Sequence, residues 1–134
     1  MSMFHEIELH TRSRTQLTDI TALINDLVSK SGVREGLCLI FVPHTTAGIT
    51  INENADSDVA DDLVKELNKV IPYEDGYKHQ EGNSAAHVKA SLMGCSQHVI
   101  IKDGRLLLGV WQGIYFTEFD GPRQRKVYIK IIEG

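Results

Sequence analysis

Two turn signals in the C-terminal third of the chain place the strongest limit on its fold. Asp103-Gly104 separates residues 97–102 from residues 105–112, and we expect these segments to pair as a hairpin because Asp-Gly supplies the positive φ angles of a tight turn. Residues 113–119 continue or bend the second strand. After a further turn at Asp120-Gly-Pro, residues 125–132 alternate apolar and polar side chains. This part of the chain therefore indicates antiparallel sheet.

Upstream of these turns, predicted strands alternate with predicted helices. Residues 3–11 and 46–52 show the period of two that a strand requires, and the continuous apolar run Leu37–Val42 indicates a strand covered on both faces. Helical spacing of apolar residues occurs in three segments, namely residues 15–30, 59–70 and 85–93. In the last of these, Val88 and Leu92 are expected to face the core. The pattern predicts an α+β fold rich in antiparallel sheet, with about three helices.

Length and composition predict a single domain spanning residues 1–134. The 134 residues are 42% hydrophobic and 24% charged, and the sequence contains no repeat or linker. A net charge of -4 gives no general attraction to nucleic acid or to anionic lipid, so we expect neither as a partner. No apolar run approaches the ~20 residues of a membrane helix. With no visible signal peptide and no disulfide pattern, a cytoplasmic location is expected, with Cys38 and Cys95 both structural.

Residues 41–56 carry the densest set of chemically active side chains. His44, Thr45 and Thr46 follow the predicted strand over Leu37–Val42. The next predicted strand leads into a second polar group, which consists of Asn52, Glu53, Asn54 and Asp56. Packing alone does not require an imidazole, hydroxyls, amides and carboxylates at two strand ends. We therefore interpret this stretch as one wall of a functional site.

Three histidines are candidates for metal binding or acid–base catalysis. His44 follows a strand, His79 lies in a polar loop, and His87 starts a helix, so separate elements can bring them to one pocket. Their spacing matches no established zinc motif, and hydrogen-bonded histidines without a catalytic role explain them equally well. Glu53 and Asp56 offer the oxygen ligands that magnesium prefers. The divalent metal, magnesium or zinc, is left open.

The basic candidates are Arg123 and Arg125, which follow the Asp120-Gly-Pro turn. Arginine suits phosphate or carboxylate because its planar guanidinium donates two parallel hydrogen bonds. A solvated basic strand edge explains Arg125 as well. The candidate substrate-binding residues as a group are Thr45, Thr46, Asn52, Asn83, Ser91, Trp111, Gln112, Arg123 and Arg125. For Trp111, a place in the core is the simpler interpretation.

Several strings in order along almost the whole chain resemble the YjbQ family. They are His44-Thr-Thr-Ala-Gly48, Asn52-Glu-Asn-Ala-Asp56, Glu81-Gly-Asn83, Ala86-His-Val-Lys-Ala-Ser-Leu-Met-Gly94, Gly104-Arg-Leu-Leu-Leu-Gly-Val-Trp-Gln112 and Asp120-Gly-Pro-Arg-Gln-Arg125. The resemblance implies a two-sheet β-sandwich with helices, assembled as a homotrimer. It also implies a secondary thiamine-phosphate synthase activity, in which hydroxymethylpyrimidine diphosphate and thiazole phosphate are joined and pyrophosphate is released.

Residue chemistry assigns roles that fit such a reaction. Loss of pyrophosphate requires charge stabilisation of the leaving group, which a divalent ion at Glu53 and Asp56 would provide together with Arg123. His44 or His87 would carry a proton or bind a different metal. Two alternatives stay open. One is another metal-dependent enzyme such as a phosphohydrolase, and the other is a non-catalytic module that binds a small phosphorylated metabolite.

Overall fold

The computed structural model describes residues 2–134 as eight strands and three helices. In chain order these are β1 (Ser2–His10), β2 (Gln16–Asp19), α1 (Thr21–Ser31), β3 (Gly36–Phe41), β4 (Ala47–Glu53), α2 (Ser57–Val70), α3 (Ser84–Met93), β5 (Ser96–Lys102), β6 (Arg105–Leu106), β7 (Gln112–Glu118) and β8 (Gln124–Glu133). No helix in this part of the chain is long and apolar enough to cross a membrane.

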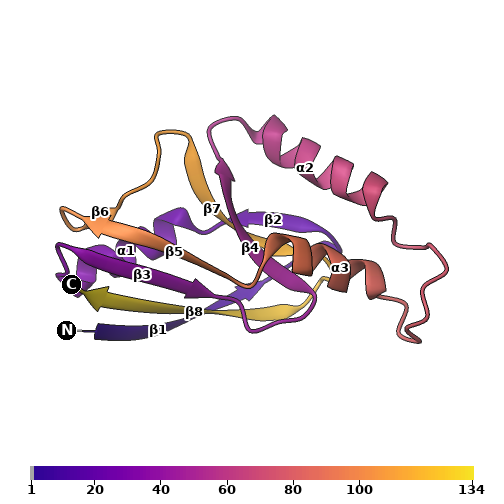
Figure 1. Cartoon of the computed structure of the whole chain (residues 1–134), viewed down its shortest axis with the longest axis horizontal. Helices are drawn as coiled ribbons and strands as arrows, with labels where there is room; N and C mark the ends of the chain where they lie inside the picture. Colours follow the sequence, from indigo (N-terminus) through magenta and orange to yellow (C-terminus); the bar gives the residue numbers. More distant parts are fainter. Residues whose placement is uncertain (1) are drawn as a thin grey trace.

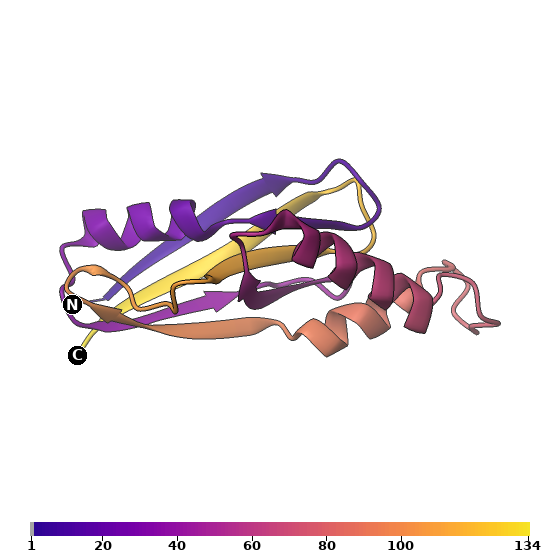
Figure 2. The ribbon, with the colours of Figure 1, turned by 90° about the horizontal axis from the view of Figure 1, so that it is seen from above.

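The strands form two antiparallel sheets. One has five strands in the order β1-β8-β3-β5-β6, and the other has three in the order β2-β7-β4. Helix α1 and the three-stranded sheet lie over the same side of the larger sheet (Figures 1 and 2). The core between them contains Ile24 and Val28 of α1, Ile40 of β3, Phe116 of β7 and Ile129 of β8, each fully buried. The predicted α+β fold with two antiparallel sheets and three helices is confirmed.

The first predicted helix begins later than expected. Residues 16–19 form strand β2, which pairs with β7 from Gln16↔Glu118 to Asp19↔Tyr115. Only then does α1 start, where the carboxylate of Asp19 accepts hydrogen bonds from the backbone N–H and the hydroxyl of Thr21 at 2.9 and 2.6 Å. A free edge of β7 is available to this segment, so tertiary pairing outweighs its helical spacing.

The second strand of the predicted C-terminal hairpin is shorter than expected. The turn itself is confirmed, because Asp103 and Gly104 have φ angles of 54° and 77°. Strand β6 contains only Arg105 and Leu106, however, and the chain then leaves the five-stranded sheet. Strand β7 belongs to the other sheet and pairs with β2 and β4. The glycine-containing segment between β6 and β7 makes this change of sheet.

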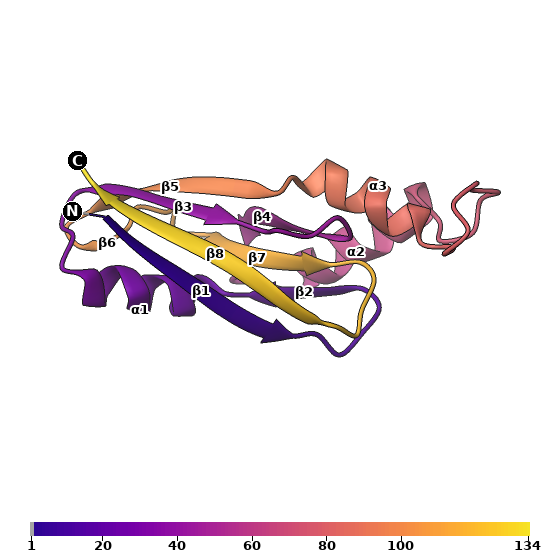
Figure 3. The ribbon, with the colours of Figure 1, turned by 90° about the horizontal axis from the view of Figure 1, so that it is seen from below.

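One face of the five-stranded sheet is exposed. Strand β3 was expected to be covered on both sides, but its burial alternates, and Leu39 and Phe41 are 36% and 40% exposed. Phe4, Ile100 and Ile132 of the neighbouring strands are also exposed. In Figure 3, β1 and β8 cross this side with no helix over them. Residues 2–134 of a single chain therefore cover only one face of the larger sheet.

Helix α3 turns a small-residue face inward. Ala85, Ala86 and Ala90 are buried, whereas Val88 and Leu92 are 42% and 63% exposed, so the expectation that these two face the core is wrong. The absence of a side chain on Gly48 lets the C-terminal end of α3 approach strand β4 closely, since a Cβ there would lie 2.7 Å from the carbonyl oxygen of Gly94. This close contact positions the helix that carries His87.

Candidate functional site

Two adjoining cavities lie where the 43–46 segment, α3 and the turn before β8 meet. His44, Thr45 and His87 line both of them. The first, called the apolar compartment below, has a volume of about 450 Å³ and is completed by Ala47, Ala90, Ser91, Gly94 and Cys95. The second, the polar compartment, has a volume of about 500 Å³ and is completed by Pro43, Thr46, His79, Glu81, Asn83, Asp120, Arg123 and Arg125. The two imidazoles therefore stand on the wall between the compartments.

A buried ion pair fixes the floor of the polar compartment. Glu118 is 0% and Arg125 is 5% exposed, and the guanidinium of Arg125 donates from Nε to Oε1 of Glu118 at 2.8 Å and from Nη2 to Oε2. Nη2 also donates to the hydroxyl of Thr46 at 2.8 Å. Thr11 Oγ1 and the Asp120 N–H donate to the same carboxylate at 2.7 and 3.0 Å. Such a fully bonded pair holds the guanidinium plane in one orientation.

The protonation state of Glu118 follows from these contacts. Burial favours the neutral acid, but the hydrogen bonds from Arg125 and Thr11 outweigh it and hold the pKa of Glu118 below its ordinary value. The carboxylate is therefore charged, and its oxygens already accept four donors. It is a positioning group and has no free lone pair directed at a ligand.

Asp120 joins the turn before β8 to the start of α3. Its Oδ2 accepts hydrogen bonds from Nδ2 of Asn83 at 2.9 Å and from Nη2 of Arg123 at 3.0 Å, and its carbonyl oxygen accepts from Nε of Arg123 at 2.8 Å. Asn83 is the N-cap residue of α3, yet its side chain makes no capping hydrogen bond. Asp120 thus holds Arg123 and the first turn of α3 against the same compartment.

His44 is the most constrained imidazole of the site. Its Nε2 accepts a hydrogen bond from the backbone N–H of Lys126 at 2.9 Å, just beyond the end of β3. Burial and the nearby charge of Arg125 lower the pKa of His44, which favours the neutral ring. His87, in contrast, bonds through its backbone, and its ring makes an edge contact with the ring of His79 at a centroid distance of 5.6 Å.

The three histidines share one wall but form no evident metal centre. His44, His79 and His87 all line the polar compartment. Within residues 2–134, however, no group of three or more His, Cys, Asp or Glu side chains is arranged to hold a metal ion. The nearby carboxylate of Glu81 lies 4.0 Å from Nε2 of His79. The three rings therefore lie at this wall as groups that can donate or accept hydrogen bonds.

The second polar group of the 41–56 stretch lies elsewhere. Strand β4 begins with Ala47 at the apolar compartment and ends with Glu53, and its seven residues span about 20 Å. Glu53 pairs with Gln112 and Asn52 with Gly113 on β7. Asp56 caps α2 by accepting from the Asp58 N–H at 2.9 Å.

Trp111 is also found at this far end of β4, where its carbonyl accepts from the Asn54 N–H at 3.0 Å. The side chain is 61% exposed, so its simpler interpretation as a core residue is wrong. Of the candidate residues, the structure therefore brings together His44, Thr45, Thr46, His79, Asn83, His87, Ser91, Arg123 and Arg125. It does not place Asn52, Glu53, Asp56, Trp111 or Gln112 with them.

The structure adds residues that the sequence did not single out. Glu118 precedes the turn before β8 and Asp120 begins it, and a carboxylate seven residues before Arg125 is the only sequence signal of the role of Glu118. Cys95, expected to be a structural residue, is exposed and lines the apolar compartment. Cys38 is buried as expected, and burial raises its pKa to about 11.

Comparisons with known proteins agree over nearly the full length of the chain. The model of the family described as "UPF0047 protein YjbQ-like" matches residues 5–134. The UPF0047 protein MJ1081 of Methanocaldococcus jannaschii is 54% identical, with 98% of this chain and 96% of that protein covered. YugU of Bacillus subtilis is 50% identical, with 97% and 99% covered.

Solved structures show the same likeness. A crystal structure of a YjbQ/UPF0047 protein from Clostridium acetobutylicum matches with a TM-score of 0.94 and 60% identity, over 96% of this chain and 99% of that one. A YbjQ-like protein of unknown function from Sulfolobus solfataricus matches with a TM-score of 0.95 and 32% identity, over 100% and 99%.

Proposed function

Since the chain belongs to the YjbQ-like UPF0047 family, we propose that its two-compartment cavity is the active site of an enzyme acting on a small phosphorylated metabolite. The observation that carries the proposal is the convergence of Arg123, Arg125 and the first turn of α3 on a cavity walled by His44 and His87. The reaction that fits best is a transfer that releases pyrophosphate, of the secondary thiamine-phosphate synthase type.

The donors needed for a phosphate group are available in the polar compartment. Both guanidiniums are paired with carboxylates, but the pairs use Nε and Nη2, and no hydrogen bond between described residues uses Nη1 of either arginine. The 10-residue helix α3 adds the positive end of its dipole, since Asn83 and His87 from its first turn line the same space. These groups together support binding of a phosphate or diphosphate.

In a transfer of this type, the new bond forms at the carbon that carries the diphosphate, and the C–O bond to the diphosphate breaks. The bonding electrons leave on the pyrophosphate oxygen, so donors held near that oxygen lower the barrier. Arg125 is pre-oriented for this by Glu118, and Arg123 by Asp120. The ring of His87 makes no hydrogen bond with the described residues, so it is the group free to donate a proton to the oxygen of the departing pyrophosphate.

A divalent ion would add charge stabilisation to the diphosphate. The carboxylates first considered for it, Glu53 and Asp56, lie at the far end of β4, so a magnesium ion would enter with the substrate. Elemental analysis of the purified protein tests for a resident transition metal. Stoichiometric zinc or manganese would favour a metal-dependent phosphohydrolase instead.

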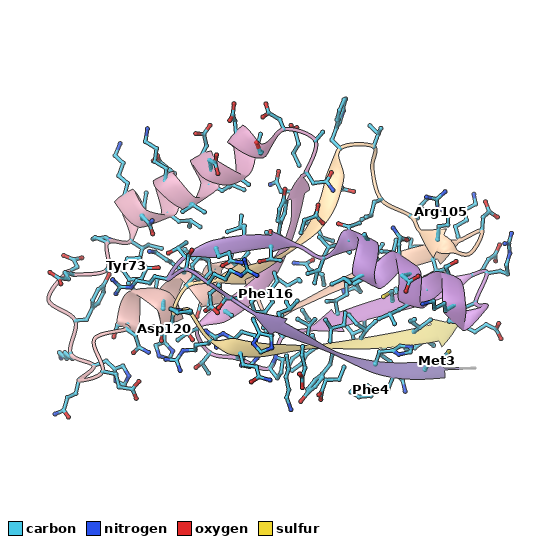
Figure 4. All side chains as sticks on the ribbon, turned by 180° about the vertical axis from the view of Figure 1, so that it is seen from behind. Met3, Phe4, Tyr73, Arg105, Phe116 and Asp120 are labelled. Carbon is cyan, nitrogen blue, oxygen red and sulfur yellow. The ribbon has the colours of Figure 1, made fainter. Side chains whose placement is uncertain are left out.

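Binding of inorganic pyrophosphate tests the proposal directly. Calorimetric titration of the Arg123→Ala variant should show an affinity about tenfold or more below the wild type, as expected for loss of a charge-assisted hydrogen bond. Arg105→Ala is the matched control, because Arg105 lies at the opposite end of the molecule from Asp120 (Figure 4). Equal affinities for the wild type and Arg123→Ala would contradict the anion site.

A turnover assay distinguishes an enzyme from a binding module. With hydroxymethylpyrimidine diphosphate and thiazole phosphate, the wild type should release pyrophosphate, and His87→Ala should abolish release while the circular dichroism spectrum is retained. Binding without turnover supports the non-catalytic module, and release of inorganic phosphate from a phosphate ester supports a phosphohydrolase. Full activity of His87→Ala would remove this cavity from consideration as the active site.

Self-association and location belong to the same proposal. The exposed apolar side chains of the five-stranded sheet, including Phe4, Phe41 and Ile100, support burial of this face in a homotrimer. Sedimentation of the protein as a monomer would count against the trimer. The free thiols of Cys38 and Cys95 support a reducing, cytoplasmic setting.

A further inference from the structure

His44 follows the end of β3 and is held in place by strand β8, which lies beside β3. Strand β3 ends at Phe41, opposite Tyr128 of β8, and Pro43 follows, which has no N–H to continue the ladder. Beyond that end, the Lys126 N–H donates to the imidazole Nε2 at 2.9 Å. The residue before it, Arg125, donates to Thr46 at 2.8 Å. Two consecutive residues of β8 thus fix the 43–46 segment.

The polarity of the Lys126 contact determines where the proton of His44 lies. A backbone N–H can only donate, so Nε2 must present a lone pair. The proton of the neutral ring then sits on Nδ1, and an imidazolium, protonated at both nitrogens, would lose the contact. No hydrogen bond between described residues uses Nδ1, and His44 lines both compartments. Nδ1–H is therefore the part of the ring that a bound molecule can meet.

The same polarity opposes metal binding by His44. A histidine that binds a metal through one nitrogen donates the other N–H to a carboxylate, a carbonyl or a water. Here the second nitrogen faces a donor. Binding through Nδ1 would place two N–H groups against each other, and binding through Nε2 would leave the Lys126 N–H without its acceptor. This agrees with the absence of a three-ligand cluster among residues 2–134.

We propose that His44 acts as a neutral hydrogen-bond donor, which binds an anionic oxygen of the substrate through Nδ1–H and serves as neither metal ligand nor proton carrier. This assigns the two imidazoles of the wall different roles, with His87 left to exchange the proton. The inference rests on the proposed anion-binding function of the cavity. It deepens that function by stating which ring recognises charge and which performs chemistry.

Nitrogen-15 NMR of the wild-type protein tests the tautomer without any substitution. Long-range proton–nitrogen correlation at pH 7 should show His44 protonated at Nδ1 only, with the signal assigned by its loss in His44→Asn. A ring protonated at Nε2, or at both nitrogens, overturns the proposal. On addition of zinc, the His44 signals should stay in place, and their displacement together with those of His79 and His87 overturns it equally.

Substitution tests the donor role with inorganic pyrophosphate as the probe. In His44→Asn the side-chain amide replaces the Nδ1–H donor, and affinity should remain within about threefold of the wild type. His44→Ala, which removes the donor, should lose about tenfold or more. Equal affinities for the two variants overturn the donor role. If the wild type itself binds no pyrophosphate, the proposed function fails, and the NMR result still decides the tautomer and the exclusion of metal.

Discussion

We expect the buried amine of Lys89 to make the unfolding free energy of this protein rise with pH in the alkaline range. The residue is 0% exposed, and its Nζ donates to Asn68 of α2 at 2.6 Å and lies 3.6 Å from the centre of the Tyr73 ring. The guanidinium of Arg14 lies at the same distance from that ring. Burial, with a further contribution from Arg14, lowers the pKa of Lys89 from 10.5 to about 8.

The sign and size of the effect follow from proton linkage. Between pH 8 and 10.5 the unfolded chain binds the Lys89 proton and the folded chain does not, so the unfolding free energy rises with pH in this window. The full rise from this residue is about 3 kcal/mol, since each pKa unit corresponds to about 1.4 kcal/mol. Below pH 8 the charged amine therefore costs the fold that amount.

Replacement by methionine should remove this dependence. Lys89→Met keeps the length of the side chain, so urea unfolding followed by circular dichroism at pH 7 and 10.5 should show the wild type gaining about 3 kcal/mol relative to the variant. The absolute stability of Lys89→Met also includes the lost bond to Asn68, so the test uses only the change with pH of the difference between wild type and variant. Exposed Lys78→Met is the control for loss of one lysine. A wild-type-minus-variant difference that changes by less than about 1 kcal/mol would refute the buried charge.

Three further outcomes follow from packing and burial. Glu118→Gln should cost about 3–5 kcal/mol, because it leaves the buried guanidinium of Arg125 without its carboxylate, and chemical denaturation should show exposed Glu66→Gln unchanged. Gly36→Ala should lower the melting temperature markedly in calorimetry, since the added Cβ would lie 2.0 Å from the Ile132 carbonyl oxygen, whereas Gly134→Ala meets nothing within 4 Å. Maleimide should label Cys95 in the folded protein and Cys38 only after unfolding, as read by mass spectrometry of the peptides. Labelling of Cys38 at the same rate would contradict its burial.

Most of the fold could be predicted from local signals, and the errors occur where distant strands compete for a segment. The period of two in β1 and β8 and the turn at Asp103-Gly104 were sufficient for those elements. Residues 16–19 carry helical spacing, but the open edge of β7 draws them into a sheet. On α3 the buried side includes Ala85, Ala86 and Ala90, so the apolar spacing of Val88 and Leu92 marked the exposed side of the helix and not the core side.

Many residues that line the site could be predicted from the sequence, but the contacts and distances between them could not. The 44–46, 79–87 and 120–125 segments line one cavity, and candidate residues had been identified from the sequence in each of the three. Glu53 was grouped with His44 because it is close in sequence, yet the length of β4 separates the two ends of that stretch. The pairing of Glu118 with Arg125 depends on the path of the chain around the Asp120-Gly121-Pro122 turn, which no local pattern reveals.

Arg125 and Lys126 of β8 hold Thr46 and His44 by hydrogen bonds, and this limits where residues can be inserted into the chain. If a residue added between Asp120 and Gln124 shifted the register of β8 by one, Arg125 would move to the opposite face of the sheet and the Lys126 N–H would be withdrawn from His44. The same shift would expose Val127 and its buried neighbours, so it would disrupt the core and the site together. In the segment between β6 and β7, Leu107 and Trp111 make backbone hydrogen bonds to Ile100 and Asn54, whereas Val110 is 85% exposed. Insertions should therefore be tolerated beside Val110, and insertions that shift the register of β8 should be excluded.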